Sequence, residues 1–163
     1  MQTQTQPGAQ AQAQTQGPIE FVERRGHTRD LVQRLLAERQ DLLVAFCEVA
    51  GLEPYHPDKP VRSLLRKFCQ LLVDYVAVVH FELCTRIADG GERRAGVRAV
   101  AEEVFPRLSA ITDEVVEFND RYEVLTPEKL AGGLSEDLSR IGETLAVRFE
   151  LEDRLFAALL ARS

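Results

Sequence analysis

Positive charge is in short supply in this sequence. Its 163 residues include 20 Lys and Arg against 26 Asp and Glu, so the net charge is −6. A protein that binds DNA or RNA directly needs a basic face to meet the phosphates, and we therefore expect no direct contact with nucleic acid. A basic protein partner is compatible with this charge, because an acidic surface attracts a basic one.

Cysteine is scarce as well, and no two cysteines form a C-x-x-C motif. Cys47, Cys69 and Cys84 all lie in apolar segments. An odd number of cysteines without framework spacing is typical of reduced thiols in the core of a cytosolic protein. The N-terminus also lacks a basic region followed by an apolar run, so we expect no secretory signal and a cytoplasmic location.

No apolar run is long enough to cross a bilayer, which takes roughly 20 mostly apolar residues. The nearest candidate is "FCQLLVDYVAVVHFELC" at Phe68–Cys84, which includes Gln70, Asp74, His80 and Glu82. We therefore expect no membrane-spanning segment here. A soluble helix normally keeps one polar face for water, and this one is apolar on nearly every side.

Motifs for catalysis and cofactor binding are missing too. The sequence has no G-x-S-x-G motif, no phosphate-binding loop and no G-x-G-x-x-G motif. A di-iron bundle requires two Glu-x-x-His pairs on its helices, and the only such pair here, Glu53 and His56, lies in a proline-containing link that cannot be helical throughout. His80 and Cys84 lack a second pair that would complete a zinc site. We predict no enzyme activity, metal or cofactor, and phosphotransfer through His80 stays open as an alternative.

The chain begins with a Gln-rich segment that has no charge. Residues 1–18 read "MQTQTQPGAQAQAQTQGP". This composition cannot bury enough apolar surface to offset the entropy of ordering the chain, so we predict a disordered tail. Residues 19–163 are then long enough for one domain with its own core.

That domain divides into four long segments with helical periodicity, at about 28–50, 60–89, 94–122 and from 126 onward. No segment alternates like a strand. The third segment has apolar residues at spacings of four and three, which is typical of a left-handed bundle: Val97, Ala101, Val104, Leu108, Ile111, Val115, Phe118 and Tyr122. We predict an all-α fold, an antiparallel up-down four-helix bundle. We also predict a monomer, because one bundle accounts for most of the apolar stripes.

Local signals mark the ends and the weak points of these helices. Gly51 is a stop signal for the first helix, and Thr126 followed by Pro127 is a start signal for the fourth. Pro106 predicts a kink or a short break in the third helix. Gly132 and the glycine after it weaken the fourth helix near its start.

The second helix has a normal core stripe, which includes Leu72, Val76, Val79 and Leu83. Roughly opposite that stripe lies a face that water should cover, but it places three apolar residues around one carboxylate: Leu71, Asp74, Val78 and Phe81. Neighbouring segments cover this face in one interpretation, and Asp74 is then a buried acid. In the other, the face binds a partner, with Phe81 as the anchor and Asp74 as an acceptor for Arg or Lys.

The fourth helix carries charge on or beside its apolar stripe, because Arg148 and Glu152 fall between Leu145 and Leu155. Buried charges need partners. At a spacing of four these two side chains can face each other, and a facing helix could supply Tyr75 or His80. The pattern fits an internal polar cluster that fixes helix register, or a cleft for a ligand or partner.

Several stretches resemble the Rsd/AlgQ family of bacterial anti-sigma factors. They are "FCQLLVDYVAVVHFE" in the second helix, "RQDLLVAFCEVAG" in the first and "IGETLAVRFELEDRL" in the fourth. The stretch "FPRLSAITDEVVEFNDRYE" is similar to the AlgQ branch of the family. The resemblance covers about Asp30 to Leu160, with all four segments in order.

This resemblance implies a function. Family members bind the primary housekeeping sigma factor, mainly through its region 4, and keep it from RNA polymerase core and from promoter −35 elements. Alternative sigma factors can then compete, and AlgQ-like members regulate alginate and other secreted products. The resemblance assigns sigma contact to Asp74 and Phe81, with Leu71 and Val78 beside them. It assigns a supporting role to a second group of residues: Tyr75, His80, Arg148, Glu152 and Asp153. A bundle that binds a small ligand remains the other alternative.

Overall fold

The computed structural model describes residues 18–161, and it describes side chains from residue 26 onward except at residues 90 and 91. Within this range the chain forms five α-helices and two π-helical segments, and no strand. The elements are α1 (Pro18–Ala50), α2 (Val61–Val78), η1 (Val79–Cys84), η2 (Ile87–Gly91), α3 (Ala95–Arg121), α4 (Pro127–Gly132) and α5 (Leu134–Leu160). The prediction of an all-α fold is confirmed. The predicted disordered tail lies outside the described residues, except for Pro18, which begins α1.

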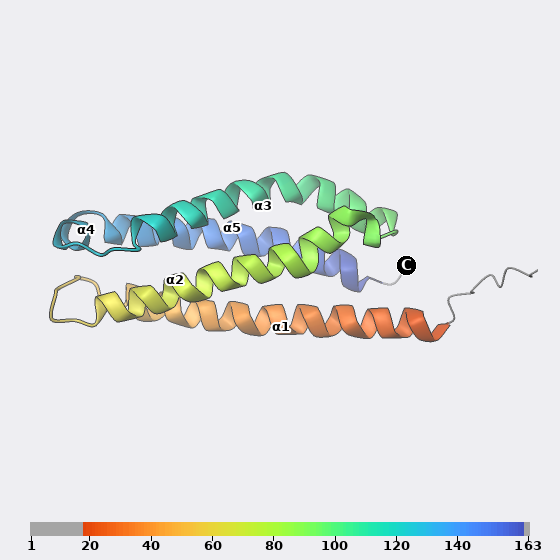
Figure 1. The fold of residues 1–163 in the computed structure, drawn as a ribbon, viewed down its shortest axis with the longest axis horizontal. Coiled ribbons are helices and arrows are strands. Elements are labelled where there is room, and N and C mark those ends of the chain that lie inside the picture. The colour runs from red at the N-terminus through yellow and green to blue at the C-terminus, as the bar shows by residue number, and fades with distance from the viewer. Residues whose placement is uncertain (1–17, 162–163) are drawn as a thin grey trace, which may run out of the picture.

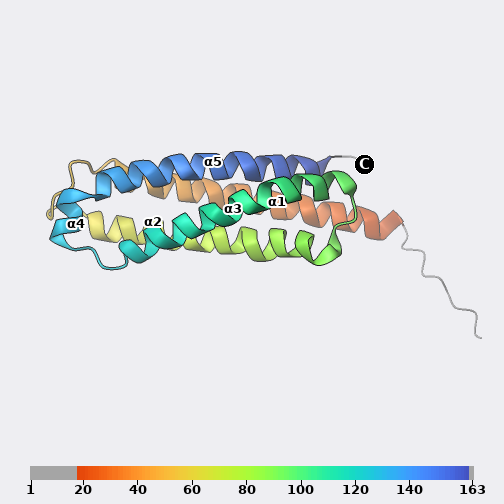
Figure 2. The same cartoon turned by 90° about the horizontal axis from the view of Figure 1, so that it is seen from above.

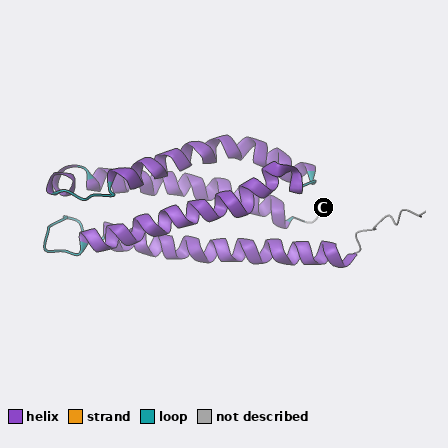
Figure 3. Ribbon diagram, in the orientation of Figure 1, coloured by secondary structure: helices purple, strands orange, loops and turns teal. Residues whose placement is uncertain are grey.

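The four long helices lie lengthwise beside one another, and successive ones run in opposite directions (Figure 1). α1 packs mainly against α2, and α3 packs mainly against α5. The short helix α4 lies at the end of the molecule where α3 gives way to α5, as Figure 2 shows from above. Only short loops join the helices in the described part of the chain (Figure 3).

The apolar stripes read from the sequence form the core. All eight residues of the predicted third stripe are buried, seven of them in α3 and the eighth, Tyr122, directly after it. In the second segment, Leu72, Val76, Val79 and Leu83 are buried as predicted. The spacing of four and three therefore identified the inward side of these helices correctly, because a helix repeats its direction every 3.6 residues.

The elements differ from the predictions in four places. α1 begins at Pro18, about ten residues before the predicted start near residue 28. The second helix widens into π-helical turns over Val79–Cys84 and again over Ile87–Gly91. The fourth segment is split at Gly133, which separates α4 from α5, while Thr126 caps α4 as predicted by accepting a hydrogen bond from the Lys129 N–H. α3 runs through Pro106 without a break and is arched rather than straight (Figure 1).

Two further predictions concern burial and membranes. Cys69 is buried and Cys84 is partly buried, but Cys47 is exposed, so the prediction of a core thiol is wrong for Cys47. By length and composition alone, Val61–Asp89 is the one helix in the described part of the chain that could cross a membrane. Core helices of soluble proteins have the same character, and the apolar stripe of this helix is packed inside the molecule.

Candidate functional site

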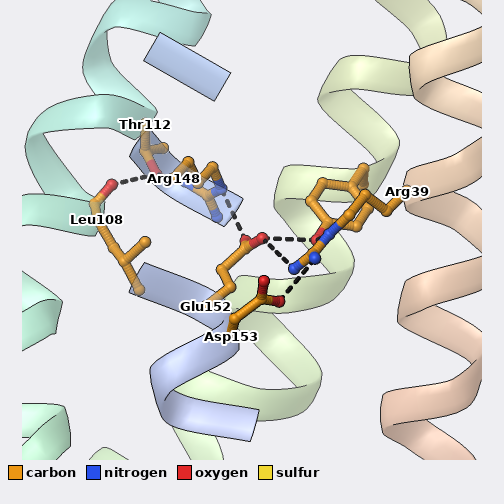
Figure 4. Close-up of polar contacts among 7 residues, drawn as sticks. Arg39, Leu108, Thr112, Arg148, Glu152 and Asp153 are labelled. Atoms are coloured by element: carbon orange, nitrogen blue, oxygen red, sulfur yellow. Dashed lines mark hydrogen bonds and ion pairs between the residues drawn. The ribbon is translucent and has the colours of Figure 1, made fainter. Parts of the chain in front are cut away.

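The carboxylate of Glu152 lies at the centre of a buried group of polar side chains. Glu152 is fully buried on α5. Its carboxylate accepts hydrogen bonds from the Tyr75 hydroxyl at 2.6 Å, from Arg148 Nε at 2.9 Å and from Arg39 Nη2 at 3.3 Å (Figure 4). Burial raises the pKa of Glu152, and Arg148, Tyr75 and Arg39 act in the opposite direction. Three donors from three helices therefore hold one acid in the core.

Arg39 brings α1 into this group. Its Nε donates to the Tyr75 hydroxyl at 3.2 Å, and its Nη1 donates to Asp153 at 2.7 Å. The guanidinium also stacks against the rings of Phe149 at 4.6 Å and Phe156 at 5.4 Å. Cation–π contacts of this kind are stronger where water is excluded. The carboxylate of Asp153 is 57% exposed, so the group reaches the surface at this residue.

Arg148 extends the group to α3. Its Nη1 donates to Thr112 Oγ1 at 3.1 Å, and the Thr112 hydroxyl donates to the carbonyl of Leu108 at 2.9 Å (Figure 4). We call these side chains the buried polar cluster: Arg39, Tyr75, Thr112, Arg148, Glu152 and Asp153. The cluster joins all four long helices and balances two cations with two carboxylates.

The buried polar cluster is satisfied by the protein itself. Among the described residues, no buried side-chain nitrogen or oxygen lacks a hydrogen-bond partner. The described part of the chain also has no group of three or more His, Cys, Asp or Glu that could hold a metal ion. Because a fully connected polar network gives a core one preferred arrangement, the geometry of the cluster suits a device that fixes helix register.

The structure brings together Tyr75, Arg148, Glu152 and Asp153, four of the five residues expected in a supporting role. His80 is an exception. Its side chain is exposed and packs edge-on against the Phe81 ring at 4.9 Å, so the expectation that it faces the cluster is wrong. On a helical wheel His80 and Tyr75 lie on opposite flanks of the core stripe.

Arg39 and Thr112 were not identified from the sequence. Arg39 lies on the core side of α1 between Leu35 and Leu42. The apolar stripe has no apolar residue in the helical turn between these two leucines. That gap was the available signal, because a charged residue in a core position needs a partner in another helix. Thr112 lies next to Ile111 on α3 and carries no comparable signal.

The second group of predicted residues lies on the outer side of α2 and η1. We call it the α2 outer face: Leu71, Asp74, Val78 and Phe81. Phe81 is 70% exposed, Asp74 is exposed, and Leu71 and Val78 are partly buried. The interpretation of Asp74 as a buried acid is therefore wrong. The Gln70 amide donates to both Asp74 oxygens, at 3.2 and 3.3 Å, and this fixes the carboxylate at the surface.

Two ion pairs set the alignment of α1 along the second helix. Lys67 Nζ lies 3.4 Å from the Glu48 carboxylate, and Arg34 pairs with Glu82 in η1. All four side chains are substantially exposed. Exposed ion pairs add little stability, but these two show which residues of the antiparallel helices face each other.

This alignment places a second acid beside the α2 outer face. Asp41 lies midway in the sequence between the two α1 residues of those ion pairs, and Asp74 lies about midway between their partners. Residues seven apart share one side of a helix, so Asp41 and Asp74 lie on the sides of α1 and α2 that border the seam between the two helices. Neither carboxylate has a cationic partner among the described residues. The seam therefore presents two acids and an exposed aromatic ring to solvent.

Known proteins are similar in sequence to this chain over nearly its whole described length. Residues 18–160 match the family model described as "Regulator of RNA polymerase sigma(70) subunit, Rsd/AlgQ". A protein named "Regulator of sigma D" from Yersinia enterocolitica is 34% identical over 139 residues, which is 83% of this chain and 83% of that relative. The protein of the same name from Shigella dysenteriae is 34% identical over 143 residues, which is 86% of this chain and 90% of that relative.

Proposed function

This chain belongs to the Rsd/AlgQ family of regulators of the RNA polymerase sigma(70) subunit, and from that premise we propose that it is an anti-sigma factor. It binds the primary housekeeping sigma factor, chiefly region 4, and keeps that region from RNA polymerase core and from promoter −35 elements. Alternative sigma factors then gain access to the core enzyme. The protein acts in the cytoplasm as a monomeric up-down four-helix bundle, without enzyme activity and without contacting nucleic acid or membrane.

The α2 outer face is the observation that supports this proposal most directly. Phe81 is the most exposed large apolar side chain in the described part of the chain, and Asp74 lies seven residues before it on the same side. An exposed aromatic ring beside a charged group is typical of the residues that contribute most to a protein interface. Leu71 and Val78 supply apolar surface on the side toward α1.

The charge of this face suits the proposed partner. Region 4 of a sigma factor is a helix-turn-helix module, and such modules meet DNA phosphates with basic side chains. The carboxylates of Asp74 and Asp41 can accept charge-assisted hydrogen bonds from the same Arg and Lys side chains. The anti-sigma factor then occupies the surface that the promoter needs.

The buried polar cluster has a supporting role in this proposal. Tyr75 follows Asp74 directly and is held by the core bonds to Glu152 and Arg39. These bonds fix the rotation of α2, so that Asp74 points outward. The two alternative functions gain no such support, because the cluster satisfies its own polar groups and none of the four residues that follow His80 is basic.

Isothermal titration calorimetry of this protein against purified region 4 tests the proposal. We expect one-to-one binding that Asp74→Ala weakens by about 1–2 kcal/mol, the scale of a lost charge-assisted contact. Asp113→Ala is the matched control, because Asp113 is exposed on α3 and forms no ion pair within the described residues. Phe81→Ala should also weaken binding, with the exposed Val116→Ala on α3 as its control.

Two results would count against parts of the proposal. Absence of binding by the unmodified, folded protein to both region 4 and full-length sigma factor rules out the anti-sigma function. Equal affinities for the Asp74→Ala and Asp113→Ala variants leave the function standing but remove the α2 outer face as the contact surface.

A further inference from the structure

A groove of about 610 Å³ lies between the first half of α2 and the segment that follows α3. Leu65, Cys69 and Tyr122 form its buried apolar floor. Val73, 37% exposed, and Val124, 64% exposed, line it closer to solvent. The groove is partly open to solvent, so it suits a segment of another protein better than an enclosed small molecule.

Two arginines give this groove a charge opposite to that of the whole protein. Arg62 and Arg66 line it one helical turn apart, in a chain whose net charge is −6. Arg62 Nη2 donates to the Leu125 carbonyl at 3.2 Å, and neither guanidinium has a carboxylate partner within 4.0 Å among the described residues. Glu123 also lines the groove but forms no ion pair in that part of the chain. Unpaired guanidinium groups suit carboxylates, which they can bind with two parallel hydrogen bonds.

The shape of the groove favours a helix. The residues of α2 that line it recur at spacings of three and four and make up one continuous side of that helix: Arg62, Leu65, Arg66, Cys69, Gln70 and Val73. At 1.5 Å per residue this side is about 16 Å long, or roughly three helical turns. An amphipathic helix that lays its apolar stripe into a groove of this kind presents anchors at the same spacings.

The groove is continuous with the α2 outer face. Gln70 lines the groove, and its amide donates to the Asp74 carboxylate at 3.2 and 3.3 Å. A partner that covers Asp74 therefore also reaches the edge of the groove. The basic helices of region 4 are repelled by Arg62 and Arg66, so a different segment of the partner must lie there.

We propose that this groove receives an acidic amphipathic helix of the same partner, from outside its basic helix-turn-helix region. The inference rests on the proposed anti-sigma function. The contact has two parts of opposite sign. The carboxylates at the α1–α2 seam bind the basic module, and the two arginines bind carboxylates of the acidic helix while Val73 and Val124 pack against its apolar stripe.

Titration of full-length housekeeping sigma factor beside isolated region 4 tests this two-part contact. We expect Arg66→Glu to weaken binding of the full-length factor about tenfold and to change the affinity for isolated region 4 less than about twofold. Arg66 has no hydrogen bond or ion pair within the described residues, so its substitution breaks no internal contact. Arg62→Glu/Arg66→Glu should enlarge the effect, and circular dichroism melting checks that each variant is folded.

A matched control for the double variant carries the same change of charge at the other end of the molecule. Arg29 on α1 and Arg98 on α3 are both exposed, and their side chains form no hydrogen bond or ion pair in the described chain. Arg29→Glu/Arg98→Glu should leave both affinities close to those of the unmodified protein. If Arg62→Glu/Arg66→Glu binds full-length sigma factor as tightly as this control, the groove is not a contact and the inference is wrong. Failure of the unmodified protein to bind at all rejects the anti-sigma function instead.

Photo-crosslinking identifies the segment that occupies the groove. A photoreactive p-benzoyl-phenylalanine replaces Val124, and the complex with full-length sigma factor is irradiated and mapped by mass spectrometry. We expect crosslinks to an acidic stretch outside region 4. Crosslinks confined to region 4, or a yield no higher than from the same probe at Arg98, would overturn the inference.

Discussion

The hydroxyl of Tyr75 donates a 2.6 Å hydrogen bond to the buried carboxylate of Glu152, a residue 77 positions later in the chain. This bond links α2 to α5 in the core. On the neighbouring position of α2, Asp74 points to solvent and is held by Gln70. The bond between Tyr75 and Glu152 adds to the buried apolar stripe of α2, and together they leave Asp74 on the outward side.

Tyr75→Phe should lower the free energy of unfolding by about 1–3 kcal/mol, the cost of leaving a buried acceptor with one donor fewer. Urea denaturation followed by circular dichroism measures this loss. Tyr55→Phe is the control, because the described residues give the partly buried Tyr55 hydroxyl no hydrogen bond. Equal stabilities for the two variants would show that the Tyr75 hydroxyl does not hold α2 in place.

Asp41→Ala should weaken binding to sigma region 4 by about 1 kcal/mol, because Asp41 borders the α1–α2 seam beside the α2 outer face and can meet the same basic partner. Calorimetry at low and at high salt measures the change. The loss should shrink as salt rises, since exposed charges are screened. Asp113→Ala on α3 removes the same charge away from the seam and should bind like the unmodified protein. A loss that is the same at both salt concentrations would contradict a charge interaction.

Asp137 should make the stability of the protein sensitive to acid. Burial tends to raise the pKa of Asp137, but hydrogen bonds from Tyr122 and Arg121 outweigh it, and the pKa lies below its ordinary value of 3.8. As the pH falls, the Asp137 carboxylate therefore becomes protonated in the unfolded chain at a higher pH than in the folded protein. The stabilisation from Asp137 is fully present above about pH 4 and is lost as the pH falls through the lower pKa of the folded state.

Asp137→Asn tests this dependence. The variant should be less stable than the unmodified protein at pH 6, and the difference in unfolding free energy should narrow as the pH falls below about 4. Urea denaturation at several pH values measures it. Asp113→Asn serves as the reference, because Asp113 is exposed and has no ion pair among the described residues. A difference that stays constant with pH would show that the carboxylate charge is not what stabilises this contact.

The sequence revealed the parts of the structure that depend on local periodicity. The stripe on α3 and the cap at Thr126 follow from spacing and side-chain chemistry along one helix, and both are confirmed. The pairing of Arg148 with Glu152 was also visible, because both residues are on one helix at a spacing of four.

What the sequence did not reveal depends on how separate helices meet. Arg39 is more than a hundred positions from Asp153, yet the two are in contact. Whether His80 in η1 is exposed depends on which side of the second helix has no other helix packed against it. The groove beside Arg62 is formed by α2 together with the segment after α3, and no pattern within either segment specifies how closely the two approach.

Arg39→Met should lower the free energy of unfolding by about 2–4 kcal/mol. Methionine keeps apolar contact with Phe149 and Phe156 but removes the donors to Tyr75, Glu152 and Asp153. The buried Glu152 charge then has only Arg148 and Tyr75 to offset its burial, and breaking a buried charge network is costly. Arg34→Met is the control, because its ion pair with Glu82 is exposed and should contribute less than about 1 kcal/mol. If Arg39→Met and Arg34→Met lower the free energy of unfolding by the same small amount, the cluster does not fix the register of α1. The α2 outer face must then be positioned by apolar packing alone.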